Sequence, residues 1–512
     1  MQKGSRTTKS LKNSSIALTF YFVNLILQFF SRKIFLDYLG TEILGLNTTA
    51  TNLLQFLNLA ELGIGTAVGF SLYKPFYEKD TQTINEIVAL QGKLYQRIAY
   101  IVIVGSAILM CFFPLIFAKM TLPLWYAYAS FGVLLFSALL SYFVNYKQVL
   151  LSADQKEYKI QYSYKATMLF KVLAQILAIK YFENGYVWWL VLEIVFAVVA
   201  SCALHITVKR TYPFIKKTEL TYKELNAKYP TIKTKIKQLF VHKVAGYVLN
   251  QTSPLIIYSF ASLTLVALYG NYMLIVLGLI SMAAALSNGL TAGVGNLVAE
   301  GNTDKVLSVF EELFSVRFFI TAIMCFGMFT LAQPFIILWI GEEYLLSTSA
   351  LALITAILFV SISRFTIESF LNAYGFFSDI YAPLIEAILN LGLSILLGYY
   401  FGLNGILSGV LISLLLVVLG WKPIFLFKIK LKKGLRRYCF IYAKHLLLSG
   451  LTALLSYHLI RHLPIVEKAN FGTFMLYSAI CISGYSFILL TTLCLFRCGI
   501  RNVIKRLLRV IK

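Results

Sequence analysis

Long apolar runs recur along the whole sequence, and nearly every charged residue lies between two of them. A helix needs about 20 consecutive apolar residues to cross a bilayer, and the runs supply about fourteen segments of that length. With 59% hydrophobic and 13% charged residues, the chain is too apolar for an ordinary soluble protein. The sequence therefore predicts an all-α, polytopic membrane protein.

The predicted spans are joined by short loops, apart from one longer basic segment after the sixth span. They cover residues 14–36, 44–73, 95–117, 124–150, 163–181, 186–208, 241–262, 264–299, 313–335, 346–371, 380–401, 404–427, 441–461 and 471–496.

The charged residues sort by side of the membrane. The chain has 46 Lys and Arg against 22 Asp and Glu, and basic clusters lie before the first span and in 209–243, 422–444 and 497–512. These clusters all fall on one side if the spans alternate in direction. Because cytoplasmic loops carry the excess of Lys and Arg, both termini are predicted to be cytoplasmic. The basic charge thus indicates contact with anionic membrane lipids, and no nucleic-acid partner is predicted.

An internal repeat divides the spans into two sets. Residue types that are rare in this sequence recur 220 positions further along: Arg97 matches Arg317, Pro114 matches Pro334, and Asn184-Gly185 matches Asn404-Gly405. Each copy holds six predicted spans, and because six is even, both copies begin on the same side of the membrane. The repeat is therefore parallel, and it predicts two six-helix bundles related by a pseudo-twofold axis near the membrane normal.

The repeat predicts four parts of the chain. They are an N-terminal six-helix lobe over 1–208, a basic cytoplasmic linker over 209–240, a C-terminal six-helix lobe over 241–427, and two extra transmembrane helices with a basic cytoplasmic tail over 428–512. The linker is predicted to lie on the anionic inner leaflet.

One acid, Glu61, lies in the middle of the second span. Residues 47–73 are predicted to form one long helix, on which a set of polar residues and one glycine falls within an arc of roughly 120°. The set is Asn47, Thr51, Gln55, Asn58, Glu61 and Gly65. An unpaired carboxylate facing lipid is costly, so the arc is predicted to face a water-filled cavity or polar neighbours. Glu61 is then either a functional acid in a cavity or a structural acid paired with a neighbouring helix.

Three basic residues inside the spans, Arg32, Lys171 and Arg364, are candidates for binding an anionic headgroup or sugar acid. A structural interpretation stays open for them. Arg32 lies near the outer end of its span, where its side chain can extend to the interface, and Arg364 lies four residues before Glu368.

Asn250, Glu386 and Asn390 are candidates for ion coupling. Asn250 lies near Pro254 and Glu386 near Pro383, and proline frees a backbone carbonyl within a helix. Carboxylate, amide and carbonyl oxygens together suit Na⁺ or a transferable proton. The alternative is a polar core in which these groups satisfy one another.

Motifs for hydrolysis, nucleotide binding or metal binding are missing from the sequence. No cofactor and no metal site is predicted, and transport is predicted to run on a substrate gradient or an ion gradient. A membrane enzyme acting on lipid-linked sugars usually needs a sizeable domain outside the membrane, and the short loops argue against one.

Several local motifs together resemble the Wzx-type polysaccharide, or O-antigen, flippases of the multidrug, oligosaccharidyl-lipid and polysaccharide exporter superfamily. The resemblance covers nearly the whole chain, and its most specific part surrounds Glu61. The motifs are Arg32 with Leu39-Gly40 and Gly45-Leu46-Asn47, the run Leu59-Ala60-Glu61-Leu62-Gly63-Ile64-Gly65, Leu72-Tyr73-Lys74-Pro75, and Leu150-Leu151-Ser152-Ala153.

The resemblance implies a transporter and not an enzyme. Such proteins move undecaprenyl-pyrophosphate-linked oligosaccharide units across the bacterial cytoplasmic membrane by alternating access, coupled to H⁺ or Na⁺, for surface polysaccharides such as O-antigen or capsule. It places Arg32 and Glu61 on cavity-lining helices, and it names polysaccharide polymerase machinery as a partner. Two alternatives remain open: a cation-coupled multidrug antiporter of the same superfamily, and a flippase for the lipid-linked peptidoglycan precursor.

Overall fold

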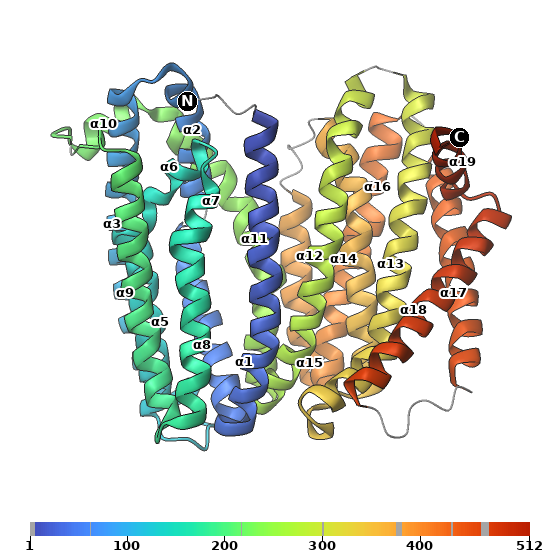
Figure 1. Ribbon diagram of the computed structural model, residues 1–512, viewed down its shortest axis with the longest axis horizontal. Coiled ribbons are helices and arrows are strands. Elements are labelled where there is room, and N and C mark those ends of the chain that lie inside the picture. The colour runs from blue at the N-terminus through green and yellow to red at the C-terminus, as the bar shows by residue number, and fades with distance from the viewer. Residues whose placement is uncertain are drawn as a thin grey trace. The chain divides into compact units, whose positions relative to one another are not determined.

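A computed structural model of the protein describes residues 6–61, 63–216, 218–299, 302–374, 381–431, 434–461 and 470–511. Every regular element within these ranges is a helix (Figure 1). Ten of the described helices are long and apolar enough to cross a membrane. The predicted fold class, an all-α polytopic membrane protein, is confirmed.

The chain divides into two compact units, Met1–Ala267 and Leu268–Lys512. The lobe and linker boundaries inferred from the repeat stay a prediction. Unit 1 contains α1 (Arg6–Leu57), η1 (Asn58–Glu61), α2 (Ile64–Glu78), α3 (Thr81–Cys111), α4 (Phe113–Ile116), α5 (Trp125–Phe143), η2 (Asn145–Lys147), α6 (Gln148–Ala153), α7 (Glu157–Ile160), η3 (Gln161–Lys165), α8 (Ala166–Tyr181), α9 (Gly185–Thr211), α10 (Tyr222–Lys228), α11 (Pro230–Phe260) and the start of α12 (Leu263–Ala299).

Unit 2 contains the rest of α12 and the helices that follow it. These are α13 (Thr303–Trp339), η4 (Glu342–Tyr344), α14 (Thr348–Ala373), α15 (Tyr381–Leu414), η5 (Leu415–Trp421), α16 (Lys422–Ile424), η6 (Phe425–Lys430), α17 (Leu435–Arg461), α18 (Phe471–Leu495) and α19 (Ile500–Ile511).

Two glycines account for part of the difference between ten long helices and about fourteen predicted spans. α1 and α15 each continue from one predicted span into the first part of the next, with a bend at Gly40 (φ 82°) and Gly402 (φ 56°). Both glycines adopt a backbone conformation that residues with a Cβ rarely enter, so each marks a bend within one apolar stretch. The predicted spans 163–181 and 241–262 are helical as well, within α8 and α11, but are not among the ten.

The helix predicted over 47–73 is interrupted, so the prediction of one continuous helix is wrong. α1 ends at Leu57, a single 3₁₀ turn follows, and α2 begins only at Ile64. Gly63 has a φ of 97°, and a Cβ at this position would lie 2.8 Å from the Cβ of Leu239 in α11. The left-handed backbone and the close approach of α11 both require glycine here. Glu61 therefore lies at a helix break.

Both copies of the Asn-Gly pair lie where two helical segments meet at close range. Asn184, with φ 57°, precedes α9, and a Cβ on Gly185 would lie 3.0 Å from the Cα of Ile179. A Cβ on Gly405 would lie 1.9 Å from the carbonyl oxygen of Leu397. Both pairs thus place a glycine at a close approach, but the left-handed residue is Asn184 in the first copy and Gly402 in the second, and the internal repeat stays a prediction.

Much of the linker between the predicted lobes packs against α3. Three side chains of α3, those of Asn85, Lys93 and Arg97, contact two backbone carbonyls and one aromatic ring of the linker. The contacts are Asn85 Nδ2 to Phe214 O (3.2 Å), Lys93 Nζ to Leu220 O (2.5 Å), and the Arg97 guanidinium 3.5 Å from the centroid of the Tyr222 ring. The linker is therefore held against α3 by polar contacts.

A capping box begins α10 inside this linker. Thr221 Oγ1 accepts a hydrogen bond from the Glu224 backbone N–H at 3.4 Å, and the Thr221 backbone N–H donates to Glu224 Oε2 at 2.6 Å. The hydrogen bonds from Thr221 hold the pKa of Glu224 below its ordinary value. The linker is thus locally structured and docked.

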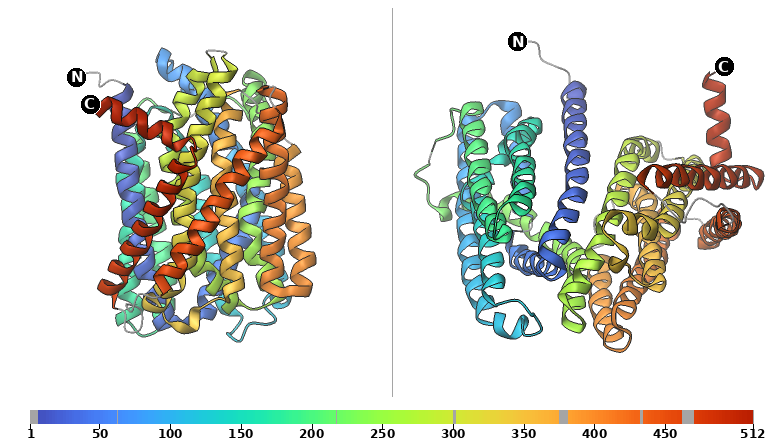
Figure 2. Two further views of the ribbon diagram at one scale, coloured as in Figure 1. Left: turned by 90° about the vertical axis from the view of Figure 1, so that its right-hand side faces the viewer. Right: turned by 60° about the horizontal axis from the view of Figure 1, so that its bottom comes forward.

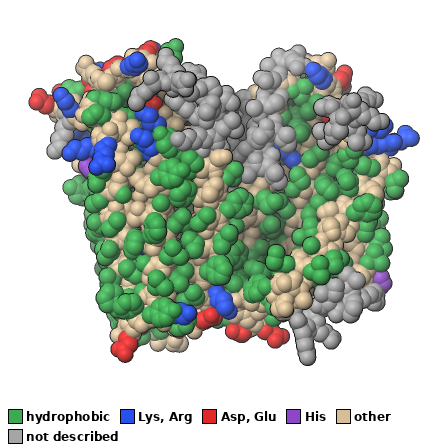
Figure 3. Space-filling model, viewed as in Figure 1, with side chains coloured by type: hydrophobic (Ala, Val, Ile, Leu, Met, Phe, Trp, Pro, Cys, Tyr) green, Lys and Arg blue, Asp and Glu red, His purple; other side chains and the backbone are tan. Residues whose placement is uncertain are grey.

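Each unit has its own apolar core. In unit 1 the core lies mainly between α2, α3 and α6, and in unit 2 it lies between α13, α14, α17 and α18. α17 and α18 pack against α13 and against each other, and α19 turns away from α18 (Figure 2). Hydrophobic side chains cover the broad middle of the face seen in Figure 3, with most of the Lys and Arg above it in that view and a few at the lower edge. This is the surface expected of a protein embedded in lipid.

Candidate functional site

Tyrosine hydroxyls from neighbouring helices hold the polar residues of η1. Tyr95 of α3 donates to Glu61 Oε1 at 2.9 Å, and Tyr142 of α5 donates to Asn58 Oδ1 at 2.7 Å. The Tyr95 ring packs against Tyr142 and Tyr146, with centroids 5.8 and 6.1 Å apart. The helix break therefore presents Asn58 and Glu61 to one cluster of tyrosines.

Glu61 has no basic partner within the described part of the chain, where its carboxylate forms no ion pair with Lys, Arg or His. A tyrosine hydroxyl satisfies a carboxylate oxygen without neutralising the charge. A carboxylate in a membrane segment that lacks a cationic partner is stabilised by taking up a proton or a cation. A role of Glu61 in exchanging one stays a prediction.

A cavity of about 430 Å³ opens beside Glu61 inside unit 1. α2, α3, α5, η2, α6, α7 and η3 contribute residues to its wall. Gly65 and Gly69 line it on α2, and Glu157 and Lys165 line it on α7 and η3. The η3 segment is a π-helical turn, a distortion that is often found at functional sites. Of the predicted arc, Glu61 and Gly65 line this cavity.

Asn47 is separated from Glu61 and lies in a different polar cluster. Its Oδ1 accepts hydrogen bonds from Ser130 of α5 and from Tyr186 of α9, at 2.5 and 2.9 Å. Fourteen residues of helix would span about 20 Å, so Asn47 and Glu61 do not share one site. Gln55 lies between them on α1 and is half-buried. The predicted stripe is therefore divided, and only its later part reaches the cavity.

Lys171 is neutralised by an acid on the next helix. Its Nζ lies 2.7 Å from Glu193 Oε1, and Gln175 Nε2 donates to Glu193 Oε2 at 3.0 Å. Glu193 is buried, so this pairing joins α8 to α9 and stabilises the pair of helices. The structural interpretation of Lys171 gains the support of these contacts.

Arg32 lies in the first half of α1 and is half-buried. Its Nη2 donates to the backbone carbonyl of Ala267, at the start of α12, at 3.2 Å. The neighbouring Lys33 pairs with the exposed Asp37 at 3.7 Å. Arg32 therefore has a protein partner at the start of α12.

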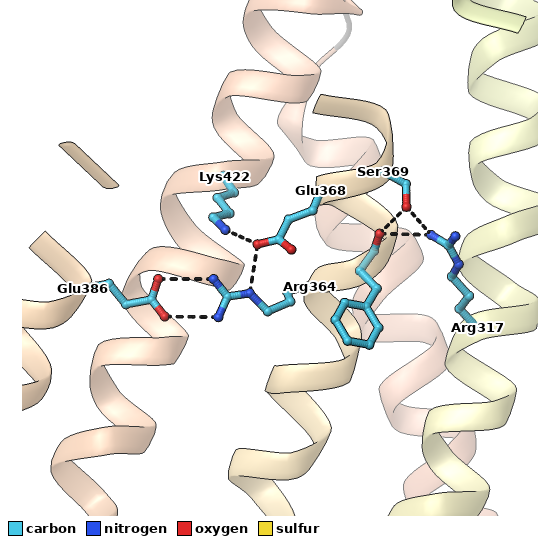
Figure 4. A network of polar contacts seen from close by, with 7 residues as sticks. Arg317, Arg364, Glu368, Ser369, Glu386 and Lys422 are labelled. Carbon is cyan, nitrogen blue, oxygen red and sulfur yellow. Dashed lines mark hydrogen bonds and ion pairs between the residues drawn. The ribbon is translucent and has the colours of Figure 1, made fainter. Parts of the chain in front are cut away.

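Arg364 belongs to a network of two cations and two carboxylates in unit 2 (Figure 4). Its Nε lies 2.9 Å from Glu368 Oε1, and its Nη1 lies 3.4 Å from Glu386 Oε1. Lys422 of α16 also contacts Glu368 Oε1. Glu386 is fully buried and Lys422 is buried. The network ties α14, α15 and α16 together, and the pairing occupies Glu386 with a fixed cation.

The remaining ion-coupling candidates are placed as follows. Asn390 is buried and its Nδ2 donates to Ser413 Oγ at 3.4 Å, while its Oδ1 has no hydrogen-bond partner among the described residues. The side chain of Asn250, in α11, lies outside what the structure describes. Over the described ranges, no group of three or more His, Cys, Asp or Glu side chains could hold a metal ion.

Sequence reasoning missed the partners that make these sites. Tyr95, Glu193 and Lys422 were not singled out, although each contacts a residue that was. A signal existed for Glu193, since a second charge inside an apolar run calls for an opposite partner. For Tyr95 the sequence holds no such signal, because tyrosine is common in this chain, with 32 residues.

Together these features define an all-α, polytopic membrane protein with a polar cavity next to an acid at a helix break. No family model matches the sequence, and no curated protein matches it. Solved structures do match. The lipid II flippase MurJ in its inward closed conformation aligns with a TM-score of 0.67 and 15% identity, over 96% of this chain and 99% of that chain.

Two multidrug transporter structures also match. An inward-facing MATE family transporter of the MOP superfamily aligns with a TM-score of 0.59 and 14% identity, over 78% of this chain and 94% of its own. A MATE structure in the bent conformation aligns with a TM-score of 0.52 and 13% identity, over 85% of this chain and 97% of its own. At these identities the likeness shows the fold, and the chain has the fold that MurJ and the MATE transporters share.

Proposed function

We propose that this protein is a flippase that moves a lipid-linked oligosaccharide across a membrane by alternating access. The observation that carries the proposal is the extent of the structural match. The alignment with MurJ covers 96% of this chain. The alignment with the inward-facing MATE transporter covers 94% of that transporter but only 78% of this chain. MurJ is a flippase for lipid II, whereas the MATE transporter confers multidrug resistance. A lipid-linked cargo therefore suits this chain better than a small drug.

The cargo is proposed to be an undecaprenyl-pyrophosphate-linked oligosaccharide repeat unit for a surface polysaccharide such as O-antigen or capsule. The Wzx-type motifs around Glu61 and at 72–75 support this choice. The protein would then lie in the bacterial cytoplasmic membrane with both termini in the cytoplasm, and it would hand its cargo to polysaccharide polymerase machinery. It would need no cofactor and would catalyse no covalent step.

Within this proposal, Glu61 couples transport to H⁺ or Na⁺, because its carboxylate accepts a hydrogen bond from Tyr95 and has no basic partner among the described residues. Arg32 is proposed to contact the anionic headgroup. The charges of Lys171 and Arg364 are balanced by acids in the structure, which favours a supporting role for them.

Deletion of the gene followed by mass analysis of lipid-linked intermediates tests the cargo. We expect a lipid-linked oligosaccharide repeat unit to accumulate and the surface polysaccharide to disappear, while the cells survive. Two results would redirect the proposal. A lethal deletion with accumulation of the peptidoglycan precursor would assign that precursor as the cargo, and raised drug susceptibility with normal polysaccharide would assign a multidrug antiporter.

The role of Glu61 is tested by Glu61→Gln, which keeps the shape of the side chain and removes its charge. Loss of a charged group from a hydrogen-bonded site costs about 1.5–3 kcal/mol, so export of polysaccharide should fall about tenfold or more. The matched control is Glu183→Gln, the same change at an exposed position between α8 and α9. Export is measured per unit of inserted protein, and normal export by Glu61→Gln at normal expression would show that the acid is structural.

A further inference from the structure

The cavity beside Glu61 is larger than the exchange of a proton requires. Its volume of about 430 Å³ lies within the range of about 300–1,000 Å³ that is typical of small-molecule sites. Gly65 and Gly69 add no side chain to the α2 part of the wall, although a Cβ would lie at an ordinary contact distance, 3.4 Å from the Tyr95 hydroxyl and 3.6 Å from Val149 Cγ2. The space is therefore large enough for a ligand of several polar atoms.

The wall of the cavity is rich in neutral side chains that form hydrogen bonds. They come from five elements and are Thr66, Gln91, Ser141, Gln148, Ser152 and Gln161. Amides and hydroxyls both donate and accept, which matches a ligand whose own hydroxyl groups do the same. The clearest case is Gln91, which is 1% exposed and whose Oε1 has no partner among the described residues. A buried acceptor without a partner calls for a donor from a ligand or water.

The charges on the wall select against an anion. Among the described residues that line the cavity, two carboxylates, Glu61 and Glu157, accompany a single ammonium group, that of Lys165, and no arginine. Pyrophosphate and carboxylate groups are usually bound by arginine in a bidentate arrangement. When Glu61 is ionised, the two carboxylates and one ammonium group give the wall a net charge of −1, which repels these anions instead. The headgroup of the lipid and acidic sugars are therefore poor occupants.

Aromatic rings stand at one side of the cavity. Phe70 and Tyr73 of α2 line it and are about half exposed, at 52% and 53%. Such rings offer an apolar face, and the tyrosine adds a polar edge. The C–H face of a sugar ring can pack on them while its hydroxyls bond to the amides deeper in the wall.

We propose that this cavity is a subsite for an uncharged sugar of the transported oligosaccharide. Gln91 Oε1 and the Glu61 carboxylate accept hydrogen bonds from its hydroxyl groups, and Phe70 and Tyr73 pack against its ring. The inference rests on the proposed flippase function and adds the chemical class of the sugar that enters unit 1. It also links binding of the cargo to ion coupling, because Glu61 contacts the sugar and exchanges the coupling ion.

The test uses the purified full-length protein in lipid nanodiscs prepared without sugar-headed detergent. Saturation-transfer NMR compares a neutral disaccharide, N,N′-diacetylchitobiose, with a uronic-acid disaccharide of the same size. We expect transfer to the neutral sugar to be at least about threefold stronger, because a like charge nearby disfavours the uronic acid. Glu157→Lys reverses the net charge of the wall and should remove this preference.

A matched pair of variants locates the binding. Gly69→Leu places a side chain into the cavity from a position where a Cβ fits, and it should abolish transfer to the neutral sugar. Gly132→Leu makes the same change on α5, where a Cβ meets nothing within 4 Å, and should leave the transfer unchanged. Circular dichroism and thermal unfolding establish that both variants are folded.

Three results overturn the subsite: no transfer to the neutral sugar, equal or stronger transfer to the uronic acid, or unchanged transfer in folded Gly69→Leu. The deletion experiment separates this failure from failure of the proposed function. If a lipid-linked oligosaccharide accumulates in the deletion strain while the NMR test fails, the flippase function stands and the sugar subsite is wrong. If none accumulates, the flippase proposal itself fails.

Discussion

The charges of Arg364, Glu368, Glu386 and Lys422 balance within a single network in unit 2. Two cations meet two carboxylates, and each carboxylate contacts at least one cation. Glu386 shows no exposed surface at all. A buried carboxylate is tolerated only when a partner compensates the cost of taking it out of water. We therefore expect the stability of this region to depend on the balance of its charges.

Arg364→Met should destabilise the protein by about 3–5 kcal/mol, because it leaves Glu386 buried without its cation and leaves two acids against one base. The double variant Arg364→Met with Glu386→Met removes one charge of each sign, and Glu368 keeps Lys422. We expect the double variant to regain most of the lost stability. Thermal unfolding of the purified proteins measures both, and a double variant no more stable than the single one would refute the charge-balance argument.

Sequence distance decides which of these contacts could be foreseen. Glu368 follows Arg364 by one helical turn, so their pairing is visible in the sequence. Glu386 and Lys422 are 22 and 54 positions away from Arg364 and Glu368, respectively, and nothing local marks them as partners. Glu61 shows the same limit. Its carboxylate is conspicuous because it lies in an apolar run, but its hydrogen-bond donor Tyr95 lies on a different helix and nothing local marks it as the partner.

At the scale of elements, the length of the apolar runs predicted the helices well. The prediction failed where a glycine in a left-handed backbone conformation interrupts a run. All the predicted spans are helical over most of their length where the structure describes them. The break after Leu57 was missed because the period of the polar residues continues across it, whereas α1 ends at Leu57 and the left-handed Gly63 comes directly before α2. The run Gly63-Ile64-Gly65 held a signal, since closely spaced glycines often mark such a break.

Two glycines of α15 should respond oppositely to the same substitution. A Cβ on Gly405 would lie 1.9 Å from the Leu397 carbonyl oxygen, so Gly405→Ala must force the turn open and destabilise the protein by more than about 1 kcal/mol. Gly392 is helical, with nothing within 4 Å of its Cβ position, so Gly392→Ala should stabilise by about 0.5–1 kcal/mol. The melting temperatures compare them, and equal effects would refute the close approach.

At the scale of the whole molecule, the contacts between loops of unit 1 show which helix ends lie together. Contacts join the predicted cytoplasmic loops at one end: Asn13 to Gln155 (2.9 Å), Asp154 to Tyr212 (2.9 Å) and Asn85 to Phe214 (3.2 Å). Other contacts join the predicted outward loops: Glu42 to Thr121 (2.6 Å) and Lys119 to Ser259 (3.1 Å). The helices of unit 1 therefore alternate in direction, which the positive-inside argument requires.

The direction of the molecule in the membrane is tested by labelling single cysteines with an impermeant reagent in intact cells. The seven native cysteines are first replaced, since Cys111, Cys202 and Cys439 are exposed. Cysteines at the exposed positions Lys119 and Glu342 should be labelled from outside, and one at the exposed Lys216 only after the membrane is opened. The reason is that Lys216 belongs to the basic linker, and loops rich in Lys and Arg stay in the cytoplasm. Labelling of position 216 but not of 119 or 342 in intact cells would reverse the orientation, and with it the side from which cargo enters the cavity beside Glu61.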